Sequence, residues 1–299
     1  MYIIKVKRYY NKKFTANYEN AEILDVNVKR LLAHNPSPFT FYGTGTYIIG
    51  DEEVAVIDPG PKIESHIKNL LKLISQASKV HLFITHTHAD HSPASKIIKD
   101  NINCITYGYG PYPRKNFNTD FEEGHDLTFK PDVTLKDGEL VKAKNWTIRA
   151  IHTPGHTSNH MCYGLEENSI LFSGDHIMGW STTVIIPPDG NMSSYIDSLK
   201  KVLDYDYKVI YPTHGGPIVK PKQFVRALIK HRLMRQKQIT NELKKNKLSL
   251  KEMVSRFYKT TDKRLWPAAE KSILANLLSL KSKGIVIDEN DKKTIWKLT

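Results

Sequence analysis

The chain has 299 residues, of which 40% are hydrophobic, so it is long enough to bury a sizeable core and to form more than one domain. No run of 18 or more apolar residues occurs, and Lys5, Lys7 and Arg8 interrupt the apolar N-terminus, which argues against a membrane span or a signal peptide. The two cysteines, Cys104 and Cys162, form no Cys-x-x-Cys pattern. We therefore expect a soluble, cytoplasmic protein that holds any metal through histidine and carboxylate groups.

The positive charge of the chain is concentrated near the C-terminus. The formal net charge is +13, yet residues 220–299 contain 21 Lys or Arg and 7 Asp or Glu, and residues 1–219 contain 23 and 24. The last 80 residues therefore carry a net charge of +14, and the rest of the chain carries −1. A localised basic region is typical of a module that binds a polyanion, and equally typical of a lysine-coated face in contact with solvent.

The first half of the chain is predicted to contain three strands and a helix. Apolar and β-branched runs at 39–50 and 52–60 predict a pair of strands. Residues 63–74 carry apolar side chains at helical spacing and predict an amphipathic helix. The apolar run at 79–85 predicts a further strand, which leads directly into the sequence THTHADH.

The sequence THTHADH contains three histidines and an aspartate within six positions. By itself this cluster would also fit a polar surface turn. Three later apolar runs, at 145–151, 169–173 and 208–211, predict strands that likewise end at Gly- or Pro-bearing loops with His or Asp. The donors on the four loops are His86, His88, Asp90, His91, His156, Asp175 and His214. These side chains can converge if the strands lie side by side with their ends at one edge of a sheet.

The residue types of this set indicate a site for two metal ions. Imidazole nitrogens and carboxylate oxygens are good zinc ligands, and three protein ligands per ion leave a position open for water. Seven donors suit two ions that share one carboxylate. Two zinc ions roughly 3.5 to 4 Å apart can hold a hydroxide between them and neutralise the attacking and leaving oxygens. The set therefore predicts a hydrolase.

The motifs THTHADH, TPGHT, SGD and PTHG, in this order, resemble those of the metallo-β-lactamase superfamily, and the resemblance covers residues 20–220. It implies an αββα sandwich with the site at one edge of its two sheets. The ligands that it implies for one zinc ion are His86, His88 and His156. Those that it implies for the other are Asp90, His91 and His214. Asp175 would bridge the two ions, Asp90 and Asp175 would be catalytic, and Asp58 in VIDPG would orient a ligand.

Departures from the superfamily patterns narrow the expected activity. The true β-lactamases usually carry Cys where Asp175 stands, so we do not expect lactam hydrolysis. Nucleases of the superfamily with a large inserted domain carry it between the aspartate and the last histidine. Only 38 residues separate Asp175 from His214 here, which excludes that subgroup.

Four further side chains near these motifs have both a functional and a structural interpretation. His160 and His176 lie next to expected ligands, where they would support a ligand, contact the substrate or simply hold their own loops together. Thr182 and Thr183 follow the bridging aspartate closely enough to line the pocket, and they also fit an ordinary strand.

The C-terminal region predicts three helices and a hairpin. Residues 224–245 have a helical apolar pattern, and a second helix starts at Ser249, which has capping-box spacing with Glu252. A third helix begins near Pro267 and stops at Gly284, after which IVI, DEND and TIWKL predict a short two-stranded hairpin. This order is typical of a winged helix. We therefore expect two domains: 1–221, the hydrolase domain, and 222–299, a basic winged-helix-like domain.

The combined pattern resembles the beta-lactamase-like protein 2 subfamily, whose members include single-stranded-RNA endonucleases. The similarity includes HTSNHMCYGLEENSILFSGDHIMG and LWPAAEKSILANLL. We therefore expect a hydrolase with two Zn²⁺ ions per chain that cleaves single-stranded RNA and contacts it through the basic domain. An acyl or thioester hydrolase of the glyoxalase II kind would use nearly the same ligands. A nucleic-acid-binding protein with a vestigial site is the alternative of another class, although a buried His and Asp cluster without metal is costly.

Overall fold

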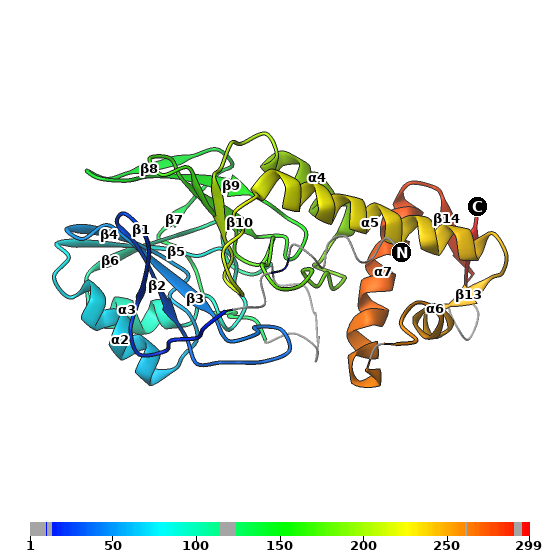
Figure 1. The fold of residues 1–299 in the computed structure, drawn as a ribbon, viewed down its shortest axis with the longest axis horizontal. Helices are drawn as coiled ribbons and strands as arrows, with labels where there is room; N and C mark the ends of the chain where they lie inside the picture. Colours follow the sequence, from blue (N-terminus) through cyan, green and yellow to red (C-terminus); the bar gives the residue numbers. More distant parts are fainter. Residues whose placement is uncertain (1–9, 11–13, 114–123, 261, 290–294) are drawn as a thin grey trace.

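The computed structural model describes residues 10, 14–113, 124–260, 262–289 and 295–299. Two sheets lie face to face, with helices α2 and α3 on the outer side of one sheet and α4 and α5 on the outer side of the other (Figure 1). A smaller C-terminal domain follows α5. This arrangement confirms the predicted αββα sandwich with a winged-helix-like domain.

The first sheet has seven strands in the order β1-β2-β3-β4-β5-β6-β7. The strands from β1 to β4 pair antiparallel, and those from β4 to β7 pair parallel. The strands are β1 (Glu22–Asp25), β2 (Val28–Leu32), β3 (Gly45–Ile49), β4 (Glu53–Ile57), β5 (Lys79–Phe83), β6 (Cys104–Gly108) and β7 (Val133–Thr134). The helices on its outer face are α2 (Glu64–Ile74) and α3 (Ala94–Asn101).

The strand predicted at 39–50 is wrong over its first six residues, because β3 begins only at Gly45. Phe41 and Gly43 have φ angles of 62° and 135°, values that a strand does not accommodate. A Cβ atom at Gly43 would lie 2.0 Å from the backbone oxygen of Ala33, so the chain needs glycine there to turn closely past β2. Residues 39–44 consequently form a loop beside the site.

The second sheet has five strands in the order β12-β11-β10-β9-β8. β9 and β11 both pair antiparallel with β10, and β11 pairs parallel with β12, so the C-terminal ends of β9, β11 and β12 lie at the same edge. The strands are β8 (Leu140–Lys142), β9 (Thr147–His152), β10 (Met161–Leu165), β11 (Ile170–Phe172) and β12 (Val209–Tyr211). The outer helices are α4 (Met192–Val202) and α5 (Pro221–Leu243).

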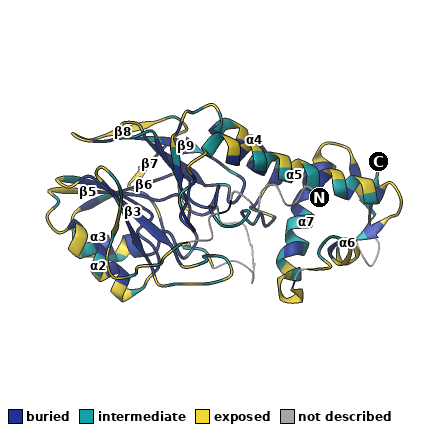
Figure 2. Ribbon diagram, viewed as in Figure 1, coloured by how far each residue is buried: buried dark blue, intermediate teal, exposed yellow. Residues whose placement is uncertain are grey.

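Large buried side chains fill the space between the two sheets. Tyr47 and Phe83 from the first sheet pack in one cluster with Tyr163 and Phe172 from the second, and each is at most 1% exposed. Figure 2 shows the buried residues concentrated on the strands of both sheets. This packing holds the ends of β5, β9, β11 and β12 close to one another.

The C-terminal domain has its own small core. Its elements are β13 (Leu248–Ser249), α6 (Leu250–Phe257), the 3₁₀ turn η1 (Lys263–Leu265), α7 (Trp266–Ser282), β14 (Val286–Glu289) and β15 (Ile295–Leu298). The predicted capping box is present, because the Ser249 hydroxyl accepts from the Glu252 backbone N–H and the Glu252 carboxylate accepts from the Ser249 backbone N–H. β13, β15 and β14 form a three-stranded sheet, one strand more than predicted.

Helix α5 belongs to both cores. Phe224, Val225 and Leu228 pack against the second sheet and α4, and Ile239 and Leu243 pack in the C-terminal core. The domain boundary between residues 221 and 222 therefore stays a prediction, since one continuous helix crosses from core to core. Within the described ranges, no helix is both long enough and apolar enough to cross a membrane.

Candidate metal centre

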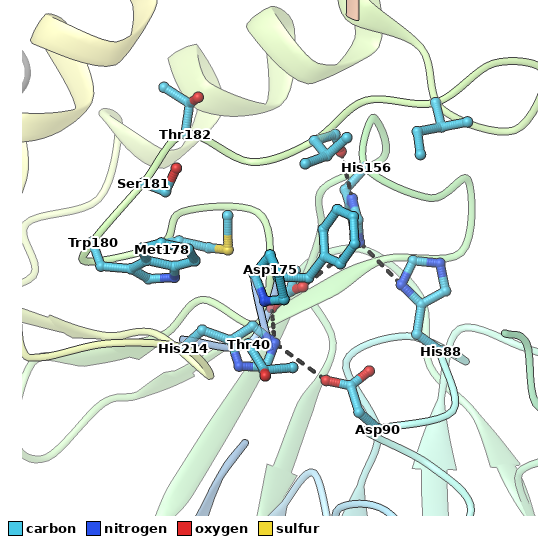
Figure 3. A pocket seen from close by; sticks show the side chains of 14 residues that line it. Thr40, His88, Asp90, His156, Asp175, Met178, Trp180, Ser181, Thr182 and His214 are labelled. Carbon is cyan, nitrogen blue, oxygen red and sulfur yellow. Dashed lines mark hydrogen bonds and ion pairs between the residues drawn. The ribbon is translucent and has the colours of Figure 1, made fainter. Parts of the chain in front are cut away.

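The seven predicted donors lie together at the edge where the two sheets meet. The loop after β5 carries four of them, and the loops after β9, β11 and β12 carry one each. All seven side chains are buried, with exposed fractions of 0–8%. Figure 3 shows several of these side chains pointing toward one another: His88, Asp90, His156, Asp175 and His214.

Three histidines form the first donor group. His88 Nδ1 lies 2.9 Å from His86 Nε2 and 3.2 Å from His156 Nε2. One donor atom from each of the three lies within 4.8 Å of the other two. Three nitrogens that converge on one point from different loops could hold a metal ion.

An aspartate and two histidines form the second donor group. Asp90 Oδ2 lies 3.3 Å from His91 Nε2 and 3.2 Å from His214 Nε2. The three donor atoms again lie within 4.8 Å of one another. The carboxylate gives this group a negative charge that the histidine-only group lacks.

Asp175 lies between the two groups. Its Oδ1 atom is 3.3 Å from His214 Nε2 and 3.7 Å from His91 Nε2, and its Oδ2 atom is 3.7 Å from His156 Nε2. The buried atoms Asp175 Oδ1 and His91 Nε2 form no hydrogen bond with any described residue. Buried polar atoms are normally paired, so two unpaired acceptors facing a donor cluster fit a bound cation.

Backbone carbonyls hold two of the rings with Nε2 facing the cluster. His156 Nδ1 lies 2.8 Å from the Val184 carbonyl oxygen, and His214 Nδ1 lies 3.1 Å from that of Gly43. A carbonyl only accepts, so each Nδ1 carries a proton, and in the neutral form of the ring Nε2 then keeps its lone pair. A lone pair at Nε2 is what a metal requires of histidine.

Asp58 holds the ring of His91 in the same way. His91 Nδ1 donates to Asp58 Oδ2 at 2.8 Å, which leaves Nε2 of His91 as the cluster-facing atom. Three further donors hold Asp58: the Thr85 N–H at 2.8 Å, the Thr85 hydroxyl at 2.7 Å and the Thr213 hydroxyl at 3.2 Å. This contact is the one predicted for Asp58, and its effect on metal binding stays a prediction.

His160 and His176 lie behind the donors. His160 Nε2 accepts from the backbone N–H of Asp175 at 3.2 Å, and its Nδ1 lies 2.9 Å from the Thr153 hydroxyl. His160 therefore contacts a donor residue through the backbone. His176 is fully buried, and its ring lies 4.9 Å from that of Tyr195. Neither ring is among the described residues that line the cavity, so contact with the substrate stays a prediction for both.

The charges of the metal-free groups differ because their neighbours differ. Burial and then the neighbouring histidines lower the pKa of His86 well below its usual value. Burial opposes a charged His214, but the carboxylates of Asp175 and Asp90 outweigh it and raise the pKa to about 10. Burial would likewise raise the pKa of Asp175, but His214 and His91 outweigh it and hold that pKa below its usual value. In the metal-free protein His86 is therefore neutral, whereas His214 and Asp175 carry opposite charges.

A cavity of about 550 Å³, counting its open mouth, reaches the donors. His88, Asp90, His156, Asp175 and His214 are among the residues that line it, as Figure 3 shows. The rest of its lining is largely apolar: Pro38, Phe39, Thr40, Met178, Trp180, Ser181, Thr182, Val184 and Ile186. Among the described lining residues there is no Lys or Arg.

Sequence reasoning found Thr182 in the lining but missed most of the wall. Phe39 comes from the loop that was predicted as a strand, and Trp180 stacks on Phe41 of the same loop with ring centroids 4.8 Å apart. Thr183 does not line the cavity; it is 2% exposed and bonded to the backbone. Apolar wall residues resemble core residues in a sequence, so no local signal distinguished them.

The threonines that support the donors were also missed. Thr44 donates from its hydroxyl to Asp90 Oδ2 at 3.0 Å, and Thr85 and Thr213 hold Asp58. One signal was available, because Thr85 and Thr213 each directly precede a donor histidine in THTH and PTHG.

Comparison with known proteins agrees with this geometry. Residues 40–214 match the metallo-beta-lactamase superfamily, and residues 249–296 match the beta-lactamase associated winged helix domain. A beta-lactamase-like protein 2 homolog from Caenorhabditis elegans is 31% identical over 93% of this chain and 92% of its own length. An atrochrysone carboxyl ACP thioesterase from Aspergillus novofumigatus is 30% identical over 79% of this chain and 72% of its own.

The fold is shared with solved structures. A beta-lactamase domain protein from Burkholderia ambifaria has a TM-score of 0.81 at 18% sequence identity, covering 97% of both chains. Its similarity extends over the sandwich and the C-terminal domain alike. The order of the four motif loops, the buried donor clusters and the matched winged helix together show that this chain is a hydrolase of the metallo-β-lactamase superfamily.

Proposed function

We propose that the donor groups bind two metal ions, one in each group, with Asp175 facing both. Zn²⁺ fits the donor set, since imidazole and carboxylate are its usual ligands outside cysteine-rich sites. Two such ions would lower the pKa of a water molecule toward neutrality and neutralise charge on the reacting oxygens. The supporting observation is that Asp175 Oδ1 and His91 Nε2 are buried and form no hydrogen bond with a described residue while they face the same cluster.

The chain itself contributes a rigid set of supports around these donors. Asp58 fixes the ring of His91, and the Val184 carbonyl fixes that of His156. Thr44 binds one oxygen of Asp90 and so restricts the rotation of that carboxylate. Ligands that are held in place before the substrate arrives need no reorganisation during the reaction.

We propose an acyl thioester as the substrate. The observation that carries this choice is the cavity wall, in which Phe39, Met178, Trp180, Val184 and Ile186 supply apolar surface and no described residue supplies a positive charge. An acyl chain gains free energy from such a wall by leaving water. The same wall offers the phosphates of RNA no cationic partner. The thioesterase relative from Aspergillus novofumigatus supports the proposal, since it matches most of this chain.

Single-stranded RNA is the second candidate. The observation that favours it is the net charge of +14 on residues 220–299. A polyanion could lie on that surface and enter the cavity at one point only. RNA cleavage would then depend on contacts far from the cavity, whereas thioester hydrolysis would not.

One experiment compares both substrates on the same preparation. Purified protein loaded with Zn²⁺ is given a short acyl thioester and a single-stranded oligoribonucleotide, beside an Asp175→Ala variant purified identically. We expect thioester hydrolysis that the variant lacks. Any RNA cleavage that persists in the Asp175→Ala preparation comes from a contaminating nuclease. RNA cleavage that disappears in the variant, without thioester hydrolysis in the wild type, would refute the thioester proposal and support RNA.

A further inference from the structure

A buried arginine connects helix α5 with the loop behind the metal centre. Arg232 is 4% exposed, and its Nη2 donates to the Thr183 carbonyl oxygen at 2.5 Å. Its guanidinium carbon lies 5.0 Å from the ring centroid of Tyr195 on α4. Among the described residues Arg232 forms no ion pair, and its buried Nε has no hydrogen-bond partner.

An arginine in this environment costs folding free energy. Taking a guanidinium out of water is unfavourable, and one carbonyl and one aromatic ring offset only part of that desolvation penalty. An apolar side chain of similar volume would pack there without that penalty. The role of Arg232 is therefore to be found in the groups that it contacts and not in a gain of stability.

The peptide that Arg232 binds also supports two donor residues. The Thr183 hydroxyl donates to the Asp175 carbonyl oxygen at 2.7 Å, and so ties the 183 backbone to the aspartate between the two donor groups. The next carbonyl, that of Val184, accepts from His156 Nδ1 at 2.8 Å. A shift of this peptide would move the acceptor that sets the tautomer and orientation of His156.

The second contact of Arg232, with the ring of Tyr195, also connects it to His156. Tyr195 packs directly on Gly155, where a Cβ atom would lie 2.3 Å from the Tyr195 Cα. Gly155 immediately precedes His156, so the packing of Tyr195 on Gly155 restricts the backbone position of that histidine. The Tyr195 hydroxyl also donates to the His176 carbonyl oxygen at 3.0 Å, one residue after Asp175.

We propose that Arg232 is a positioning residue for the metal centre, which fixes His156 and Asp175 through the Thr183 peptide and Tyr195. Because α5 packs in both cores, the same contact couples the C-terminal domain to the donor geometry. The inference rests on the metal site of the proposed function and is independent of the choice of substrate.

The test uses Arg232→Met, Arg232→Lys and the matched control Arg226→Met in the full-length chain. Arg226 lies on the same helix but is exposed, so its loss should leave the metal centre unchanged. Metal-free protein is titrated with Co²⁺, whose visible absorption reports the number and affinity of bound ions. Thermal unfolding of the metal-free proteins is measured in parallel to separate fold stability from metal affinity.

We expect Arg232→Met to bind Co²⁺ roughly 10- to 100-fold more weakly, the range typical for loss of a residue that supports a metal ligand. Arg232→Lys keeps one donor that can reach the carbonyl, so we expect it to recover part of this loss. Arg226→Met should match the wild type. With Zn²⁺ at saturation, kcat of Arg232→Met should fall more than KM changes, because the donors and not the cavity wall are displaced.

Equal Co²⁺ affinity in the wild type and Arg232→Met would overturn the inference, even if the variant unfolds at a lower temperature. That result would assign Arg232 to folding alone. If Arg232→Met does not fold, Arg232→Gln is titrated in its place, because its shorter side chain leaves the Thr183 carbonyl without this donor. Wild-type affinity in that variant would likewise contradict positioning. Wild-type protein that binds no Co²⁺ would instead overturn the proposed metal centre, and this outcome is visible before any variant is compared.

Discussion

The cavity at the metal centre and the C-terminal 80 residues differ in charge and in the way their side chains are held. The cavity wall is apolar and its donors are buried and bonded, whereas residues 220–299 carry a net charge of +14. Many of the basic side chains in that region, such as Lys244, Lys259 and Lys283, are exposed. The charge of a chain therefore says little about the pocket in which its chemistry takes place.

The largest expected effect comes from Asp175, whose carboxylate faces both donor groups. Asp175→Ala should lower hydrolysis of any substrate by more than the roughly 100-fold that loss of a supporting partner costs, since it removes a ligand itself. It should also lower the metal content below two ions per chain. Activity assays with metal analysis check this, and a fully active variant would refute the shared carboxylate.

Asp90 should give a smaller effect that is confined to one donor group. Asp90→Asn keeps the size of the side chain and its contact with Thr44 but removes the negative charge opposite His91 and His214. We expect turnover to fall roughly 10- to 100-fold with little change in unfolding temperature. Unchanged turnover at unchanged metal content would show that Asp90 has no catalytic role.

Trp180 separates the two substrate candidates at the cavity. Trp180→Ala removes apolar wall and the stacking on Phe41, so kcat/KM for an acyl thioester should fall roughly tenfold. Trp266→Ala is the control, because that ring packs against the C-terminal core outside the cavity. If both variants hydrolyse the thioester as well as the wild type, the acyl chain does not bind in this cavity.

Binding of RNA to residues 220–299 can be tested by its dependence on salt concentration, without truncating the chain. Deleting residues from 226 onward would remove Leu228 and Ala275 from the core of the sandwich, so charge substitutions are a cleaner test. If single-stranded RNA binds there, the logarithm of its affinity should fall with the logarithm of salt concentration by roughly 0.7 per phosphate contact.

Lys237→Gln with Lys244→Gln should then reduce that slope by up to about 1.4, whereas Lys136→Gln with Lys142→Gln, exposed on the sandwich domain, should not. Binding measured between low and high salt by fluorescence anisotropy checks both pairs. A flat salt profile for the unmodified chain would exclude the RNA candidate.

The smallest effect concerns stability in acid. Burial, followed by the positive charges of Arg232 and Arg235, lowers the pKa of His231 to about 4. The imidazole of His231 therefore takes up a proton more readily in the unfolded chain than in the folded one. The contribution of neutral His231 to the free energy of unfolding is fully present above pH 6.5 and is lost as the pH falls toward 4. His231→Gln should reduce the loss of unfolding free energy between pH 7 and pH 5 by roughly 1–2 kcal/mol. Denaturant unfolding at both pH values checks this, and an unchanged loss would contradict it.

Much of the sandwich was predictable because local patterns agree with it. The amphipathic helix at 63–74 and the apolar strands before each motif match α2, β5, β9, β11 and β12 to within a few residues. Short or partly exposed strands were missed, among them β1, β7 and β8, because they lack a clear alternation of polar and apolar residues. The loop at 39–44 was mistaken for strand, since its aromatic and threonine residues favour strands and only the tertiary contact at Gly43 prevents one.

The sequence by itself predicted which seven side chains would converge, because four loops that follow apolar strands each carry histidine or aspartate. Which atoms face one another was decided only by the tertiary structure. β5 lies in one sheet and β9, β11 and β12 in the other, so the groups meet through the packing of two sheets and not along the edge of one. The supports come from still further along the chain: Gly43 holds His214 across 171 positions, and Arg232 reaches Thr183 across 49. Such contacts leave no local pattern, since any carbonyl can accept a hydrogen bond and only the fold brings a particular one within reach.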